Sequence, residues 1–135
     1  MNVEIDHLGI AVRSLEEALG FYEGVLGMAA SGRETVEAEQ VNVAMLPAGS
    51  GAGASRIELL EATGEGSPIA KFVEKRGPGL HHVALRVDDL AGATERLRQA
   101  GARLLNEPRA GAGGHAYVFV HPASAGGVLL ELIQK

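Results

Sequence analysis

Two histidines and two glutamates stand at matching places in two similar stretches of this chain. His7 begins the stretch His-Leu-Gly-Ile-Ala-Val, and His82 begins His-Val-Ala-Leu-Arg-Val. Glu58, in Ile-Glu-Leu-Leu, and Glu131, in Leu-Glu-Leu-Ile, follow their histidines at nearly the same spacing. Imidazole nitrogens and carboxylate oxygens suit Co²⁺, Mn²⁺, Ni²⁺, Zn²⁺ or Fe²⁺. If the two stretches face each other, the four side chains form one divalent-metal site.

Such a site has a definite chemistry. Four protein ligands on a six-coordinate ion leave two adjacent places for water or for a substrate that binds through two oxygens. An ion held there polarises an oxygen next to a reacting carbon. Each residue alone has a plainer explanation, as a solvated glutamate or a hydrogen-bonded core histidine. Their placement at repeat-related positions favours the metal site.

The hydrophobic pattern predicts where the two histidines point. Residues 3–12 and 81–87 alternate as half-buried strands, in which neighbours point to opposite faces. Apolar residues occupy the face opposite the histidine in each strand: Leu8, Ile10, Val12, Val83, Leu85 and Val87. Because this apolar face must cover the helix of its own module, we expect both histidines on the other face.

The remaining elements follow from caps and periodicity. A capping box at Ser14–Glu17 and a terminal Gly27 predict a first helix. Its sheet-facing side chains are expected to be Leu15, Leu19, Tyr22 and Leu26. Further helices are predicted from Pro68 to about Arg76 and from Asp89 to near Gly101. Further strands are predicted at 39–46, 56–61, about 102–106, 115–121 and 127–134.

The pattern therefore predicts the element order β-α-β-β-β for each half, and the predicted fold class is α+β. The two tandem βαβββ modules would pair into a cup-shaped, curved mixed sheet with the helices outside. We place module one at about 1–62, a linker helix at about 63–78 and module two at about 79–135, all within a single domain.

Composition argues against several classes of function. The chain has 135 residues, a net charge of −5 and no cysteine. The acidic balance argues against nucleic acid as a partner, and the lack of cysteine rules out a thiolate nucleophile and fits a reducing cytoplasm. Apolar runs fall short of the ~20 residues that span a bilayer. We therefore expect a cytoplasmic protein with no membrane partner and no signal or transit peptide.

The duplicated pattern with His7, Glu58, His82 and Glu131 resembles the vicinal oxygen chelate superfamily. That group includes glyoxalase I, extradiol dioxygenases, fosfomycin- and bleomycin-resistance proteins and methylmalonyl-CoA epimerases. Three segments are similar to the epimerase family in particular: Ser67–Gly77, Gly79–Asp89 and Phe119–Leu132. The Asp-Pro-Asp-Gly turn typical of glyoxalase I is replaced by His-Pro-Ala-Ser-Ala-Gly-Gly. Its first residue, His121, is interpreted as a structural anchor of that turn.

The resemblance implies an enzyme that interconverts (2R)- and (2S)-methylmalonyl-CoA by removing the α-proton through a metal-stabilised enolate. It also implies a homodimer. The implied metal is a divalent ion, with Co²⁺ first and Mn²⁺, Ni²⁺ or Zn²⁺ as alternatives, and Glu131 would also transfer the proton. Some family members carry a second glutamate where this chain has Val43, with Glu37 and Glu39 nearby but offset. The implied metal ligands are His7, Glu58, His82 and Glu131.

Three other functions stay open at this point. A glyoxalase I-type lactoylglutathione lyase would use the same four ligands on a thiol-adduct substrate. An extradiol dioxygenase would use two histidines and one glutamate with Fe²⁺, so Glu58 counts against it. A non-catalytic small-molecule-binding member of the superfamily would keep the fold and lose the metal residues, whereas all four are present here.

Overall fold

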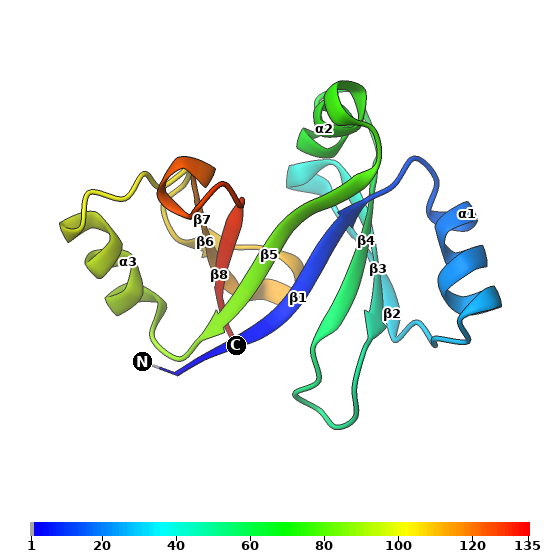
Figure 1. The fold of residues 1–135 in the computed structure, drawn as a ribbon, viewed down its shortest axis with the longest axis horizontal. Helices are drawn as coiled ribbons and strands as arrows, with labels where there is room; N and C mark the ends of the chain where they lie inside the picture. Colours follow the sequence, from blue (N-terminus) through cyan, green and yellow to red (C-terminus); the bar gives the residue numbers. More distant parts are fainter. Residues whose placement is uncertain (1) are drawn as a thin grey trace. The chain divides into compact units, whose positions relative to one another are not determined.

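The computed structural model describes residues 2–135 and divides them into two compact units (Figure 1). Unit 1 comprises the chain up to Asp6 together with His82–Lys135, and unit 2 comprises His7–His81. The first strand, β1 (Val3–Ala11), contributes residues to both units, and so does β5 (Gly79–Val87).

Unit 2 is built from four strands in the order β2-β3-β4-β1. The pairs β2–β3 and β3–β4 are antiparallel, whereas β1 runs parallel to β4. After β1, its elements in chain order are α1 (Leu15–Leu19), a π-helical turn (Gly20–Val25), β2 (Gly32–Val36), a 3-10 turn (Glu37–Glu39), β3 (Val41–Pro47), β4 (Arg56–Ala62) and α2 (Pro68–Arg76).

Helices cover both faces of these strands. Leu15 and Leu19 of α1 pack against Ala44, Leu46 and Leu59 on one face. On the other face, which carries the alternate residues of β3 and β4, Ile69 of α2 packs into a second cluster with Ala11, Val41, Val43 and Leu60. Because successive strand residues point to opposite faces, the period-2 sequence pattern supplies both layers. Ile10 and Val12 join the α1 cluster, as predicted.

The first helix begins and ends where the sequence indicates but changes its winding midway. Ser14 accepts a hydrogen bond from the Glu17 amide at 3.2 Å, as a capping box requires. From Gly20 to Val25 the backbone is π-helical, with the Leu26 amide bonded to the Phe21 carbonyl at 3.0 Å. A π-turn holds more residues than an α-turn, which rotates the next side chains around the helix axis. Leu26, predicted to face the sheet, is therefore 56% exposed, and that prediction is wrong.

Unit 1 repeats the same plan with strands in the order β5-β8-β7-β6. β5 runs parallel to β8, and the other pairs are antiparallel. In this unit α3 packs its Leu90 and Ala93 on Val87, Val118 and Leu132. The elements after β5 are α3 (Leu90–Gln99), β6 (Arg109–Ala110), a 3-10 turn (Ala112–Gly114), β7 (Ala116–Val120), a 3-10 turn (Pro122–Ser124) and β8 (Leu130–Gln134).

The α+β class, with one βαβββ module in each half of the chain, is confirmed. The strand predicted at about 102–106 is wrong, because only Leu104 makes an isolated bridge there, to Val120. β2 was not predicted, although the repeat required a fourth strand in each half. The module boundaries stay a prediction. Among the described residues, no helix is long and apolar enough to cross a membrane.

Candidate metal and proton-transfer site

Unit 2 brings His7 and Glu58 together. The Nδ1 atom of His7, on β1, lies 3.3 Å from the Oε2 atom of Glu58, on the neighbouring β4. The same carboxylate oxygen lies 2.6 Å from a terminal guanidinium nitrogen of Arg56. The histidine and the glutamate are both buried, and the two partners of the Glu58 carboxylate offset the cost of burying it.

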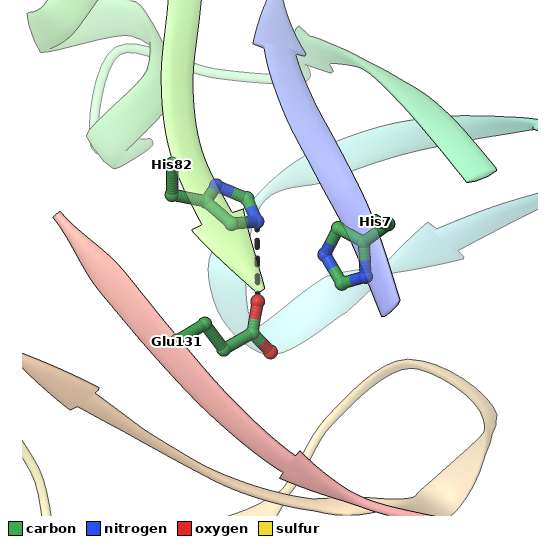
Figure 2. A group of neighbouring side chains, drawn as sticks. All are labelled: His7, His82 and Glu131. Carbon is green, nitrogen blue, oxygen red and sulfur yellow. Dashed lines mark ion pairs between the residues drawn. The ribbon is translucent and has the colours of Figure 1, made fainter. Parts of the chain in front are cut away.

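Unit 1 brings His82 and Glu131 together in the corresponding way. The Nε2 atom of His82 lies 3.1 Å from the Oε1 atom of Glu131, and both residues are buried. Figure 2 shows the two side chains pointing toward each other from β5 and β8; His7, also drawn there, belongs to the other unit. The His82 ring also meets Phe119 edge to face, with ring centroids 5.6 Å apart.

Strand register explains why both pairs form. Glu58 stands opposite Gly9, two residues after His7, and Glu131 stands opposite Ala84, two residues after His82. Because residues two apart in a strand point to the same face, each histidine lies on the same face as its glutamate. The residue directly opposite the glutamate is Gly9 in one module and Ala84 in the other, and these small residues leave room for the two side chains to meet. The repeat seen in the sequence is therefore also a repeat of geometry.

The donor sets fit a divalent metal. An octahedral ion with ligand bonds of ~2.1 Å places neighbouring donors roughly 3.0 Å apart. The nitrogen–oxygen distances of 3.1 Å in unit 1 and 3.3 Å in unit 2 are close to that value. His7, Glu58, His82 and Glu131 are buried and each offers one ligand atom. The four predicted ligands thus come together as two pairs, and their sharing of one ion stays a prediction.

Around the pair of unit 1, the same face carries an aromatic wall. Phe119 stands opposite Glu131 in the ladder, and Tyr117, two residues earlier, lies on the same face of β7. The two rings meet edge to face with centroids 5.6 Å apart. The Tyr117 hydroxyl accepts a hydrogen bond of 2.8 Å from Nε of Arg109 on β6. This wall gives the face an apolar side next to the two candidate ligands.

Asn106 holds this wall in place. Its side-chain oxygen accepts from the Phe119 amide at 2.8 Å, and its side-chain nitrogen donates to the Tyr117 carbonyl at 3.3 Å. These side-chain bonds add to the backbone hydrogen bond from the Leu105 amide to the Phe119 carbonyl, 2.9 Å long. The sequence offers little warning of this, because an asparagine in a loop is ordinarily assigned to a turn.

Asp6 is a buried charge that the sequence reasoning did not select. Its side chain is fully buried, and Oδ1 lies 3.2 Å from Nε of Arg86 and 3.1 Å from Nζ of Lys135. All three residues belong to unit 1. The cluster ties β1, at the residue immediately before His7, to Arg86 of β5 and to Lys135. An aspartate inside an alternating strand was the one signal that could have identified it.

Two further positions are settled by the structure. His121 accepts a hydrogen bond at Nδ1 from the Ala123 amide at 2.9 Å, which confirms its role as the anchor of the 122–124 turn. Val43 is 3% exposed and belongs to an apolar cluster, so it offers no acid or base. Glu34, on the unpredicted strand β2, stands directly opposite Val43.

The chain is similar over nearly its full length to proteins of a known family. A family model described as Glyoxalase/Bleomycin resistance protein/Dioxygenase superfamily matches residues 6–119. An uncharacterized protein of Bacillus subtilis is 42% identical over 96% of this chain and 91% of its own. The ethylmalonyl-CoA/methylmalonyl-CoA epimerase of Cereibacter sphaeroides is 39% identical over 96% of both. A solved methylmalonyl-CoA epimerase in complex with methylmalonyl-CoA and NH4+ is 36% identical, with a TM-score of 0.94 over 100% of this chain and 96% of that one.

Proposed function

Because the chain belongs to the glyoxalase/bleomycin resistance protein/dioxygenase superfamily, we propose that it is a metal-dependent epimerase acting on methylmalonyl-CoA. The observation that carries this proposal is the pair of buried His–Glu sets at the same register in the two modules. The full-length similarity to epimerases named for this substrate supports the reaction. The enzyme would interconvert the (2R) and (2S) forms.

In this proposal His7, Glu58, His82 and Glu131 hold one divalent ion, with Co²⁺ as the first candidate and Mn²⁺, Ni²⁺ or Zn²⁺ as alternatives. The bound ion would stabilise the negative charge that forms on the thioester oxygen as C2 loses its proton. The donor distances within each pair support this assignment, since they match neighbouring places on one coordination sphere.

The protein's own residues position and move the proton. Glu131 would take the proton of C2 on one face of the substrate, and the nearby His82 and Phe119 would fix the direction of its carboxylate. Burial of these groups keeps water away from the carbon while it is deprotonated. Glu58, held by both His7 and Arg56, would serve as a ligand only, because its oxygen is fixed from two sides.

A glyoxalase I-type enzyme would use the same four ligands, so the ligand set does not separate the two reactions. The similarity to epimerases over 96% of both chains favours the epimerase. The proposal also includes a homodimer and a cytoplasmic location, which rest on the family resemblance and on composition. Light scattering of the purified protein would give the mass of the assembly, with twice the chain mass expected.

The direct test follows hydrogen exchange at C2. Metal-stripped protein reconstituted with Co²⁺ is incubated with (2S)-methylmalonyl-CoA in D₂O, and NMR records deuterium at C2 and the (2R) product. We expect both to require metal and to fall by at least about 100-fold in His82→Ala and Glu131→Gln, because each removes a ligand or the proton carrier. Matched controls are His121→Asn and Glu95→Gln, both outside the site.

Absence of hydrogen exchange at C2 with Co²⁺, Mn²⁺, Ni²⁺ and Zn²⁺ alike would exclude the epimerase. Hemithioacetal substrates would then test the glyoxalase reaction, and binding of small molecules by metal-free protein would test a non-catalytic role.

A further inference from the structure

Unit 2 gathers its unpaired cations around one helix. Arg33 pairs with Glu16, and Arg56 pairs with Glu58. The other arginines and lysines of unit 2 form no ion pair with any residue that the structure describes. In a chain with a net charge of −5, such a concentration of positive charge indicates an anionic ligand. These cations are Arg13, Lys71, Lys75 and Arg76, which lie on α2 or beside its end.

The cations of α2 share one side of the helix. Lys71 and Lys75 are about one turn apart, and so are Phe72 and Arg76, so the two rows lie next to each other. The two lysines and the arginine are exposed, and Phe72 is partly buried. We call this surface the α2 patch; its members are Arg13, Lys71, Phe72, Lys75, Arg76 and His81.

The patch contains aromatic rings next to one of its cations. The guanidinium carbon of Arg76 lies 5.8 Å from the centroid of the Phe72 ring. Phe72 in turn meets the His81 ring edge to face, with the two centroids 5.1 Å apart. Phe72 is held in place because it packs against the apolar cluster under α2. A guanidinium over a ring offers a flat surface on which a nucleobase can stack while its phosphates meet the neighbouring charges.

The end of α2 does not by itself account for these charges. Basic side chains in a last helical turn commonly offset the partial negative charge there, and two of the four cations stand in that turn. Lys71 lies earlier in the helix, and Arg13 is outside it, with its Nη2 atom 3.9 Å from where a Gly77 Cβ atom would lie. Glu74, the one acidic residue of α2, lowers the positive charge without cancelling it. The patch therefore keeps more positive charge than a helix end requires.

Within unit 2, α2 covers the far end of the face that carries His7 and Glu58. Ile69 of α2 packs with Ala11 and Leu60. Ala11 and Leu60 lie on that face, because each follows the histidine or the glutamate of its strand by an even number of residues. Figure 1 shows α2 beside the C-terminal end of β1. One strand therefore leads from a candidate metal ligand to the helix that carries the patch.

The distance along this strand suits the length of a CoA thioester. His7 and Arg13 are six residues apart in the sequence, so at ~3.3 Å per residue their Cα atoms are at most roughly 20 Å apart. In a CoA thioester about thirteen bonds link the sulfur to the first phosphorus, and at peptide dimensions such an arm extends roughly 15 Å. With the acyl group at the candidate ligands of unit 2, the phosphates come within reach of long arginine and lysine side chains at the patch.

We propose that the α2 patch binds the nucleotide end of the acyl-CoA substrate. This inference rests on the proposed function and adds the place where the phosphates of the substrate are held. The lysines and Arg13 neutralise the phosphates, and the Arg76 guanidinium beside Phe72 provides the adenine ring with a surface for stacking. Because the patch is remote from C2, it binds substrate and transition state equally and lowers KM without changing kcat.

The test compares two substrates that differ only at the nucleotide end. Methylmalonyl-CoA and methylmalonyl-pantetheine share the acyl group, the thioester and the arm, and epimerisation of each is measured with Co²⁺-loaded protein. For the wild type we expect KM to be at least about tenfold lower with methylmalonyl-CoA, and kcat to agree within about twofold. The double variant Lys75→Gln/Arg76→Gln should raise KM for methylmalonyl-CoA by at least about tenfold and leave kcat/KM for methylmalonyl-pantetheine unchanged.

A matched control removes the same charge from the other unit. Arg96 and Arg103 are exposed and form no ion pair with the described residues, so Arg96→Gln/Arg103→Gln should leave both KM values within about twofold of wild type. The variant Lys75→Arg/Arg76→Lys keeps both charges of the patch and should keep KM for methylmalonyl-CoA within about threefold. Added KCl should raise KM for methylmalonyl-CoA more than KM for methylmalonyl-pantetheine, because salt screens exposed charges.

A binding measurement gives a readout that does not depend on turnover. Adenosine 3′,5′-bisphosphate, which is the nucleotide end of CoA without the arm, is titrated into the protein by calorimetry. We expect Lys75→Gln/Arg76→Gln to raise the Kd of this nucleotide by at least about tenfold. Arg96→Gln/Arg103→Gln should leave that Kd unchanged.

Several results would overturn the inference. Equal KM values for the two thioesters in the wild type would show that the protein does not bind the nucleotide end. An unchanged KM for methylmalonyl-CoA in Lys75→Gln/Arg76→Gln would place the nucleotide elsewhere, and an equal loss of kcat/KM with both thioesters would assign the two residues a structural role. Wild-type protein that epimerises neither thioester would instead reject the proposed function, and with it the assignment of the α2 patch to its substrate.

Discussion

At the scale of single residues, the site depends on carboxylates that are buried but not isolated. Glu58 has an imidazole and a guanidinium at the same oxygen, and Glu131 has His82 at 3.1 Å. Burial of a lone carboxylate is costly, whereas partners within hydrogen-bond distance offset much of that cost. A metal ion can take the place of such a partner. The His–Glu pairs therefore stabilise the buried carboxylates and can also serve as ligands for a cation.

Asp6, which is not among the four predicted ligands, follows the same principle. It is fully buried between Arg86 and Lys135, whose side chains are 20% and 21% exposed. Asp6→Asn removes the negative charge and leaves two half-buried cations facing each other. We expect the free energy of unfolding to fall by about 3 kcal/mol, measured by urea denaturation of metal-free protein. Asp88→Asn, at an exposed position, is the control, and equal stability of both variants would refute this account.

At the scale of elements, sequence periodicity predicted the strands and helices that have one buried face. β1, β5, α2 and α3 combine strong alternation or clear caps with an apolar layer, and the structure places them within a few residues of expectation. β2 alternates between small, charged and polar residues at a sheet edge, so it has no continuous apolar stripe. The internal repeat is stronger evidence for β2 than the local pattern, since the second module has β6 at the corresponding place in the strand order.

His7, Glu58, His82 and Glu131 were predicted as ligands because their residue types and their places in the repeat agree. The structure brings them together as two His–Glu pairs, and their role stays a prediction. Asp6 was missed because its partners Arg86 and Lys135 are remote in sequence. Contacts set by tertiary structure leave little trace in local pattern.

Asn106 allows a test at this scale. Asn106→Ala removes the two side-chain hydrogen bonds from Asn106 to β7 and leaves the backbone bond from Leu105 to Phe119 in place. It should lower the free energy of unfolding by about 1–2 kcal/mol. Asn106→Asp keeps the acceptor for the Phe119 amide and should lose less. Thermal unfolding of both, beside an exposed Gln99→Ala control, measures the difference. If Ala and Asp cost the same, the Phe119 bond is not the main tie.

At the scale of the whole molecule, duplication places the same pair of candidate ligands in each module. Each module supplies one histidine and one glutamate from the same two strands at the same register. A single module offers only two protein donors, which bind a divalent ion weakly. Two modules offer four, and they also allow the copies to diverge, so that Arg56 now holds Glu58 in one unit while Phe119 stands opposite Glu131 in the other.

The stoichiometry of metal binding tests whether the two pairs act together. If all four residues share one ion, calorimetric titration of metal-free protein should give one Co²⁺ per chain. His7→Ala and His82→Ala should each weaken binding of that single ion by at least about tenfold, because each removes a ligand from the same sphere. If each pair bound its own ion, wild type would take up two, and either variant would keep one site of unchanged affinity. Since the proposed chemistry needs substrate, ligands and proton carriers around one centre, the second result would exclude the four-ligand site even if the protein were an active epimerase.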